Sequence, residues 1–184
     1  MIFKTYVING TAESGKDQFI EFIRQTLKEM KLPQETFVFN NSTVDSIRDF
    51  LSNLGLKEKT QEWRNAMGNI KNSCEKIDSD VFNRECFRFV QERNLFKNKN
   101  QIKINFIHCR EPHNIERIKN MFHDINWHCQ TILIRRYDVD GKFNNDKDSL
   151  DFISSYNYDY VLTNTELEMF KKKAQIFTET EILL

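Results

Sequence analysis

Two kinds of hydrophobic pattern alternate along this chain. Short apolar runs bounded by polar or turn residues are typical of buried parallel strands. Longer segments with an apolar residue at every third or fourth position are typical of helices that cover one face of a sheet. The first pattern predicts strands over Ile2–Ile8, Glu35–Phe39, Ile102–Ile107, Thr131–Ile134 and Tyr158–Leu162.

The helical pattern fills the segments between these strands. It predicts a helix capped by Ser42 or Thr43 that runs to Leu54, and further helices over Lys16–Met30, Thr60–Ile77, Asp78–Leu95, Pro112–Asp124, Leu150–Ser154 and Glu166–Phe177. Alternating strands and helices favour one α/β domain over residues 1–184, with helices on both faces of a mostly parallel five-stranded sheet. Residues of about 42–95 then form a helical insertion, and the polar segment of about 135–148, which contains Gly141, is expected to be a lid-like loop.

The segment GTAESGKD, from Gly10 to Asp17, separates the first strand from the first helix. Its spacing matches GxxxxGK, in which glycines let backbone NH groups surround an anion and the lysine reaches the β and γ phosphates. A chance turn would also contain such residues, but the strand before the loop and the helix after it favour a phosphate loop. The predicted nucleotide-binding residues are Gly10, Thr11, Ala12, Glu13, Ser14, Gly15, Lys16, Asp17 and Gln18.

Asp17 stands where such loops usually carry the Ser or Thr that holds Mg²⁺. A carboxylate can bind the ion directly or through water, or it can weaken the site by adding negative charge beside the phosphates. A second acidic residue commonly follows a neighbouring strand. That strand here ends in His108 and Cys109, so Glu111 is the nearest candidate for the metal, although it would equally suit the start of the Pro112 helix.

Arginines follow two of the predicted strands. Arg110, Arg135 and Arg136 suit contact with a transferring phosphoryl group, and together with Lys16 they are the predicted catalytic residues. Surface arginines at strand ends would look the same. Asp45, Arg48, Arg64 and Lys71, on the helices of the insertion, have the chemistry to bind a phosphorylated acceptor that carries hydroxyl groups.

Overall composition excludes several classes of protein. Lys and Arg together number 27, as do Asp and Glu, so no general attraction to nucleic acid or to acidic membranes is expected. No apolar run is long enough to cross a bilayer, and the first residues lack the pattern of a secretory signal, so we expect a cytoplasmic protein. The four cysteines are widely spaced and are expected to be free thiols; without a CxxC pair they do not favour a zinc site. Whether the chain forms oligomers is left open.

The chain resembles the nucleoside and deoxynucleoside monophosphate kinases of the phosphate-loop superfamily, especially the branch whose loop reads SGKD, here Ser14–Asp17. The resemblance continues through STVDSIRDF from Ser42, EWRNAMGNIK from Glu62, REPHNIERIK from Arg110 and YDYVLTN from Tyr158. It implies a phosphate-loop NTP hydrolase fold of the nucleotide-kinase type and an acceptor-binding helix that starts at Ser42. Phosphomevalonate kinases have a similar loop, so the loop alone does not select the acceptor.

The function expected from these residues is transfer of a phosphoryl group from ATP, with Mg²⁺, to a nucleoside or deoxynucleoside monophosphate. Two alternatives remain at this stage. One is a regulatory module that binds a nucleotide without kinase turnover. The other is a kinase for a different small metabolite.

Overall fold

The computed structural model describes residues 2–56, 60–95, 100–137 and 153–184. Its five strands form one sheet in the order β2-β3-β1-β4-β5, and every neighbouring pair is parallel. The strands are β1 (Ile2–Asn9), β2 (Glu35–Ser42), β3 (Gln101–His108), β4 (Cys129–Arg135) and β5 (Tyr160–Thr163). The predicted five-stranded parallel sheet is therefore confirmed.

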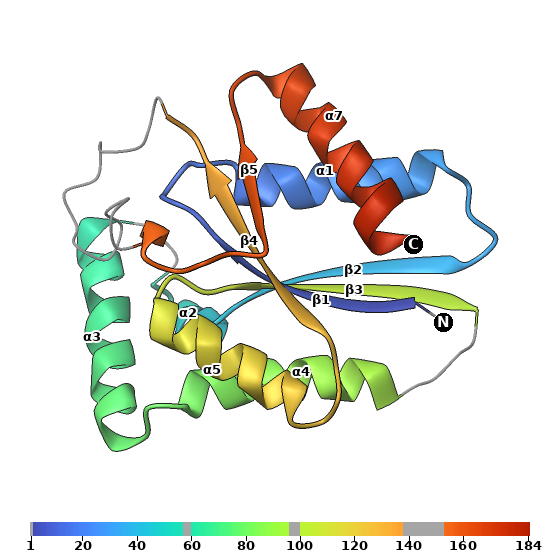
Figure 1. Ribbon diagram of the computed structural model, residues 1–184. Coiled ribbons are helices and arrows are strands. Elements are labelled where there is room, and N and C mark those ends of the chain that lie inside the picture. Colours follow the sequence, from blue (N-terminus) through green and yellow to red (C-terminus); the bar gives the residue numbers. More distant parts are fainter. Residues whose placement is uncertain (1, 57–59, 96–99, 138–152) are drawn as a thin grey trace.

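Helices cover both faces of this sheet (Figure 1). One face carries α1 (Lys16–Glu29) and α7 (Leu167–Phe177), which pack against each other, and the chain ends in a π-helical turn over Thr178–Ile182. The opposite face carries α4 (Val81–Leu95) and α5 (Pro112–His123). These layers confirm the predicted α/β/α arrangement.

The alternation of side chains along β1 explains why the sheet has two buried faces. Tyr6 and Ile8 point into the core beneath α1 and α7, whereas Val7 points into the core beneath α4 and α5. Successive side chains of a strand lie on opposite faces, so an apolar run without polar interruptions is what a strand buried on both sides requires.

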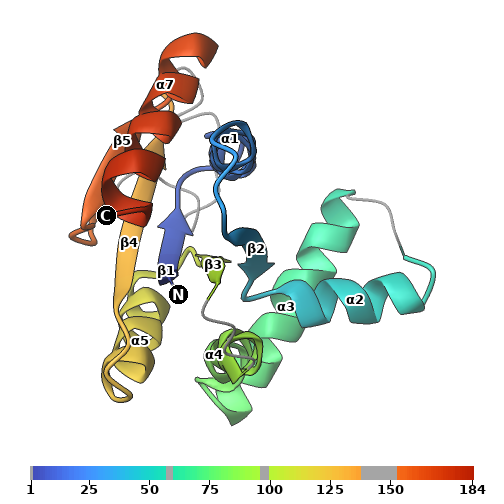
Figure 2. The ribbon, with the colours of Figure 1, turned by 90° about the vertical axis from the view of Figure 1, so that its right-hand side faces the viewer.

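Two helices of the predicted insertion stand out to the side of the sheet, as Figure 2 shows. These are α2 (Asp45–Asn53) and α3 (Gln61–Ile77), and together with α4 they enclose a small core around Ile47, Leu51 and Phe82. Thr60 caps α3, because its Oγ1 accepts a hydrogen bond from the backbone NH of Trp63 at 3.2 Å. Although α4 lies within the same predicted insertion, it packs on the sheet.

The turn between β2 and α2 differs from the prediction. Strand β2 continues to Ser42, which lies opposite His108 in the sheet, so the helix starts later and Val44 occupies its N-cap position. The expectation that Ser42 or Thr43 caps α2 is therefore wrong. The Asp45 carboxylate instead accepts a hydrogen bond from the Ser42 backbone NH at 2.6 Å, which closes the turn from the helix side.

Residues 138–148 of the predicted lid, and most of the predicted helix at Leu150–Ser154, lie outside the described residues. The four cysteines are all free thiols. Among the helices that the structure describes, none combines the length and the apolar character that a bilayer crossing requires.

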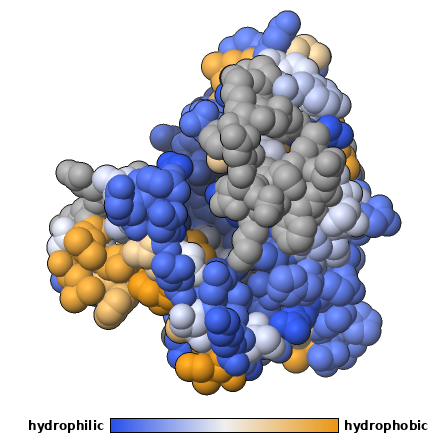
Figure 3. All heavy atoms as spheres, turned by 90° about the vertical axis from the view of Figure 1, so that its left-hand side faces the viewer, coloured by the Kyte–Doolittle hydropathy of each residue, from blue (hydrophilic) through white to orange (hydrophobic). Residues whose placement is uncertain are grey.

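Hydrophobic side chains gather on the outer part of the insertion (Figure 3), where Phe50, Leu54 and Leu56 are exposed.

Candidate functional site

The segment between β1 and α1 forms a closed loop that depends on its two glycines. Gly10 and Gly15 have φ values of 150° and 99°, which other residues rarely adopt. A Cβ at Gly10 would lie 2.4 Å from the Ile134 carbonyl oxygen, and one at Gly15 would lie 2.5 Å from Nδ2 of Asn164. Neither position has room for a side chain, so the loop shape requires both glycines.

The ammonium group of Lys16 is held inside this loop. Its Nζ donates to the carbonyl oxygens of Gly10 and Thr11 at 2.8 and 2.7 Å, and lies 3.4 Å from Oγ of Ser14. Thr11 and Ser14 are themselves buried. The positive charge of Lys16 thus lies within the loop that leads into the N-terminus of α1, an arrangement that suits phosphate binding.

The remaining predicted loop residues lie around this point. Ala12 is half-buried, whereas Glu13, Asp17 and Gln18 are exposed. Glu13 has a φ of 60°, in the left-handed region that residues other than glycine rarely adopt.

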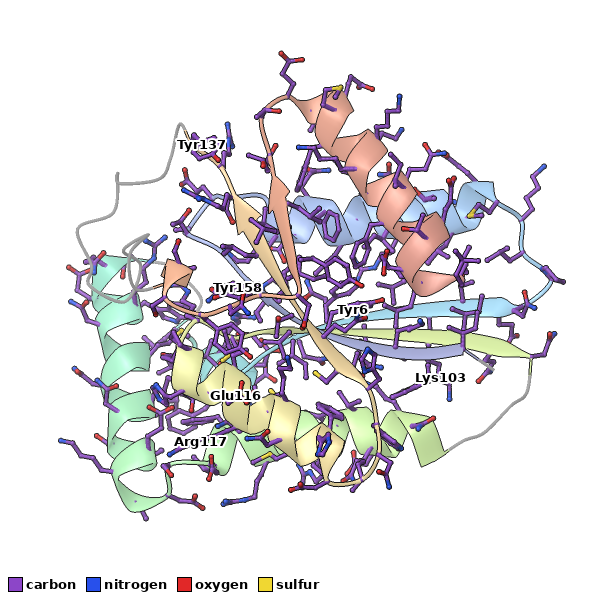
Figure 4. The ribbon with its side chains drawn as sticks, viewed as in Figure 1. Tyr6, Lys103, Glu116, Arg117, Tyr137 and Tyr158 are labelled. Atoms are coloured by element: carbon purple, nitrogen blue, oxygen red, sulfur yellow. The ribbon has the colours of Figure 1, made fainter. Side chains whose placement is uncertain are left out.

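Asn9, the last residue of β1, ties the loop to two other parts of the chain. Its Oδ1 accepts from the Gly10 NH at 2.7 Å, while its Nδ2 donates to the Arg110 carbonyl at 3.0 Å and to the Tyr158 hydroxyl at 2.7 Å. Asn9 is fully buried. Figure 4 shows Tyr158 on the side of the sheet that α5 covers. One amide thus fixes the first glycine of the loop relative to the end of β3.

Asn164 supports the other end of the loop. Its Nδ2 donates to the Ser14 carbonyl at 3.0 Å, and its backbone NH donates to the Arg135 carbonyl at 2.7 Å. The residue that follows β5 therefore connects the loop to the end of β4. Sequence reasoning did not select Asn9 or Asn164, although a polar residue at the end of an otherwise apolar strand is a signal that could have identified Asn9.

Asp17 lies where three elements meet. Its Oδ1 accepts a hydrogen bond from Nδ2 of Asn40, on β2, at 3.0 Å, and lies 3.6 Å from Nε2 of His108, at the end of β3. The Asp17 side chain is 86% exposed, so this carboxylate faces outward from the loop. His108 Nε2 is buried and makes no hydrogen bond to any described residue.

Charges from several elements act on His108. Burial is the largest cause that lowers its pKa, to about 4, and the Asp17 carboxylate opposes this shift. Lys16, Arg48 and Arg110 lower the pKa further because each is positively charged. The imidazole of His108 therefore lies in the electrostatic field of charges from the loop, from the insertion and from the segment after β3.

Glu111 and Lys71, predicted as a metal ligand and an acceptor contact, bind each other. The Lys71 ammonium donates to the Glu111 carboxylate, and both side chains are buried between α3 and the start of α5. Lys71 Nζ also lies 3.6 Å from Oε1 of Glu75. The structure thus brings these two predicted residues together in an ion pair that joins the insertion to the core.

The other predicted residues are spread over several elements. Arg48 is exposed on α2 and forms an ion pair with Asp45 at 2.7 Å, and the pKa of Asp45 is raised, mainly by burial. Arg64 is exposed on α3. Arg135 lies at the end of β4, with its guanidinium 5.0 Å from the ring centre of Tyr137, and Arg136 follows it (Figure 4).

Comparisons with known proteins agree with this architecture. No family model matches the chain, and no curated protein matches its sequence. Among solved structures, an APS kinase from Mycobacterium tuberculosis is similar, with a TM-score of 0.53 and 12% identity over 98% of this chain and 100% of that one. The crystal structure of APE1195 gives a TM-score of 0.55 and 14% identity over 98% and 97% of the two chains. The chain thus has the fold of phosphate-loop NTP hydrolases of the kinase type.

Proposed function

We propose that this protein transfers the γ-phosphoryl group of ATP to a nucleoside or deoxynucleoside monophosphate. The observation that carries the proposal is the loop geometry, in which the Lys16 ammonium lies inside a loop whose two glycines are required by its shape. Arg48 of the insertion and Arg110 after β3 add positive charge to the same region, since both lower the pKa of His108 together with Lys16. Phosphoryl transfer needs little covalent help from a protein, but it needs positive charge around the transferring group and around the two substrates. A module that only senses a nucleotide does not need a cation from the insertion beside its phosphate loop.

In this proposal the loop binds the donor. Backbone NH groups between Gly10 and Lys16 hold the β and γ phosphates, and the Lys16 ammonium exchanges the loop carbonyls for phosphate oxygens. Asn9 and Asn164 keep the loop in shape while the ammonium moves. Arg110, Arg135 and Arg136 are the candidates to neutralise charge on the transferring group.

A divalent cation would neutralise two donor phosphates when it is bound. Asp17 suits it, because this carboxylate is exposed beside Lys16 and is oriented by Asn40. Glu111 is a weaker candidate in this conformation, since the Lys71 ammonium already occupies its carboxylate. The chain would have to separate that pair before Glu111 could bind a metal.

The insertion would bind the acceptor. Arg48 would contact the acceptor phosphate. It lies on α2 of the insertion, and its charge, like that of Lys16, lowers the pKa of His108. Ser42 and Asp45 shape the turn before this helix, and Arg64 is an exposed cation on α3. The APS kinase among the similar structures brings APS into the set of acceptors to be tested.

Transfer from ATP tests the proposal directly. Purified protein is incubated with ATP, a divalent cation and each ribo- and deoxyribonucleoside monophosphate in turn, with APS as a further acceptor, and the products are separated by chromatography. We expect transfer to one or a few monophosphates and a loss of roughly a hundredfold or more in Lys16→Ala. Arg48→Ala is expected to raise the KM for the acceptor more than the KM for ATP.

Arg88→Ala is the matched control, because Arg88 is an exposed arginine of α4 whose partner is Glu92. It should leave both KM values unchanged. Binding of ATP without transfer to any of these acceptors would contradict the kinase proposal and favour a regulatory nucleotide-binding module. Transfer to APS alone would contradict the proposed monophosphate acceptor and favour a kinase for a different small metabolite.

A further inference from the structure

The end of β3 carries a histidine at the point where a carboxylate would be expected to face the metal of a phosphate-loop enzyme. His108 lies opposite Ile8 of β1 and Ser42 of β2, so it is next to the strand that leads into the phosphate loop. Asp17, which follows the loop lysine, is the acidic side chain that faces it. One carboxylate from α1 and one imidazole from β3 therefore stand together beside the proposed phosphate site.

The geometry of the pair fits two ligands of one ion better than it fits a hydrogen bond. Nε2 of His108 lies 3.6 Å from Oδ1 of Asp17, beyond the range of an N–H···O bond. Two neighbouring ligands with bonds of roughly 2.1 Å to one ion lie about 3 Å apart, so a small adjustment of the exposed Asp17 side chain is sufficient. The buried Nε2, which has no hydrogen-bond partner among the described residues, needs such a contact to offset its burial.

We propose that His108 Nε2 and the Asp17 carboxylate bind the divalent cation that accompanies the nucleotide, and that the site therefore prefers a first-row transition-metal ion to Mg²⁺. This inference rests on the proposed nucleotide binding. Mg²⁺ selects oxygen ligands, whereas an imidazole nitrogen favours transition-metal ions. Asn40 contributes by donating to the Asp17 carboxylate, which orients this ligand.

The surrounding charges make metal binding depend on the nucleotide. The positive charges of Lys16, Arg48 and Arg110 each lower the pKa of His108, so they also repel a metal cation that approaches this position without a nucleotide. Within the described residues, no three His, Cys, Asp or Glu side chains gather into a metal site. We therefore expect phosphate oxygens and water to supply further ligands, and we expect the ion to bind with the nucleotide and not before it.

Electron spin-echo spectroscopy of bound Mn²⁺ tests the contact without any turnover. Uniformly ¹⁵N-labelled protein is mixed with Mn²⁺ and unlabelled ADP, so that a ¹⁵N coupling arises only from a protein nitrogen that contacts the ion. We expect this coupling in the unaltered protein and in His123→Gln, whose histidine is exposed at the end of α5. It should disappear in His108→Gln and in His108→Asp.

Calorimetry of the same complexes gives the metal preference. The unaltered protein should bind Mn²⁺-ADP at least roughly tenfold more tightly than Mg²⁺-ADP, and His108→Asp should reduce this ratio to about one. The aspartate variant keeps a ligand at the position, so it also controls for loss of the fold. Binding of Mn²⁺-ADP without a ¹⁵N coupling would overturn this inference alone, whereas no binding of either complex would overturn the proposed function as well.

Discussion

The ammonium of Lys71 and the carboxylate of Glu111 form an ion pair that is buried between α3 and α5. The pair lies within a polar network, because Nδ2 of Asn114 donates to Glu75 at 3.3 Å while Nδ2 of Asn83 donates to Asn114 at 3.0 Å. The helical insertion is thus joined to the sheet domain by charges that are largely shielded from water.

Breaking this pair from one side should destabilise the protein strongly. Lys71→Met removes the cation that pairs with the buried Glu111 carboxylate, and we expect it to lower the free energy of unfolding by roughly 3–5 kcal/mol. Glu111→Leu should cost less, because the Lys71 ammonium keeps Glu75 at 3.6 Å. The double variant removes both charges and should lose much less than the sum. Urea unfolding of all four proteins measures the coupling. Additive losses would contradict the prediction, and Arg88→Ala, in an exposed pair, should cost below about 1 kcal/mol.

Adding a methyl group to the phosphate loop should abolish nucleotide binding. Gly10→Ala would place Cβ 2.4 Å from a backbone carbonyl, so the loop must open to accommodate it. We expect ADP binding, measured by calorimetry, to weaken at least roughly a hundredfold. Gly68→Ala is the matched control, because this glycine of α3 has open space at the Cβ position and the alanine favours a helix. Equal affinity of the Gly10→Ala protein would show that the loop does not bind the nucleotide.

Acid should destabilise the protein through His108 when no nucleotide is added. The pKa of His108 is lowered from 6.5 to about 4, mainly by burial, so between these values the unfolded chain takes up a proton that the folded protein does not. The contribution is fully present above pH 6.5 and is lost as the pH falls to about 4. It amounts to about 3 kcal/mol at most.

Urea unfolding at several pH values between 7 and 4 measures this effect against His108→Gln, which carries no titrating ring. The difference between the two proteins should change over this range. Parallel curves would show that burial does not hold the imidazole neutral.

A buried amide in the middle of the sheet should be replaceable with a gain in stability. Asn105 is fully buried opposite Thr5, and neither its Oδ1 nor its Nδ2 has a hydrogen-bond partner among the described residues. Asn105→Leu should raise the free energy of unfolding by about 1–2 kcal/mol, because an apolar side chain of similar shape carries no desolvation cost. Thermal unfolding measures the change. Asn114→Leu, which removes a bonded amide, should be destabilising, and the same loss in Asn105→Leu would contradict the prediction.

The sequence predicted the elements well because their signals are local. Runs such as Ile2–Ile8 are buried on both faces, and the GxxxxGK spacing identified the loop without knowledge of its neighbours. The order of the strands is not a local property, and neither is the contact of Asp17 with His108, which joins α1 to β3. The cap of α2 was mistaken for a related reason, since Ser42 remains in the sheet through its pairing with His108.

The acceptor residues show the same limit more clearly. The charges of Lys71 and Glu111 suggested substrate and metal contacts, and their types alone could not show that each is the other's partner. Arg48 and Arg110 were selected for their charge, and only the fold brings both close enough to His108 to lower the pKa of its imidazole. The roles expected for Arg64 in acceptor binding and for Arg135 in catalysis stay predictions.

The phosphate loop occupies Gly10–Lys16, yet its supports come from the far end of the chain. Asn9 bonds to Tyr158, and Ser14 bonds to Asn164. During synthesis a ribosome makes the loop well before these two supports, so the nascent chain carries an incompletely supported glycine loop until β5 has emerged and paired with β4. If the loop binds a nucleotide as proposed, affinity would arise only after β5 has joined the sheet, and the ligand would stabilise only chains that have reached that stage.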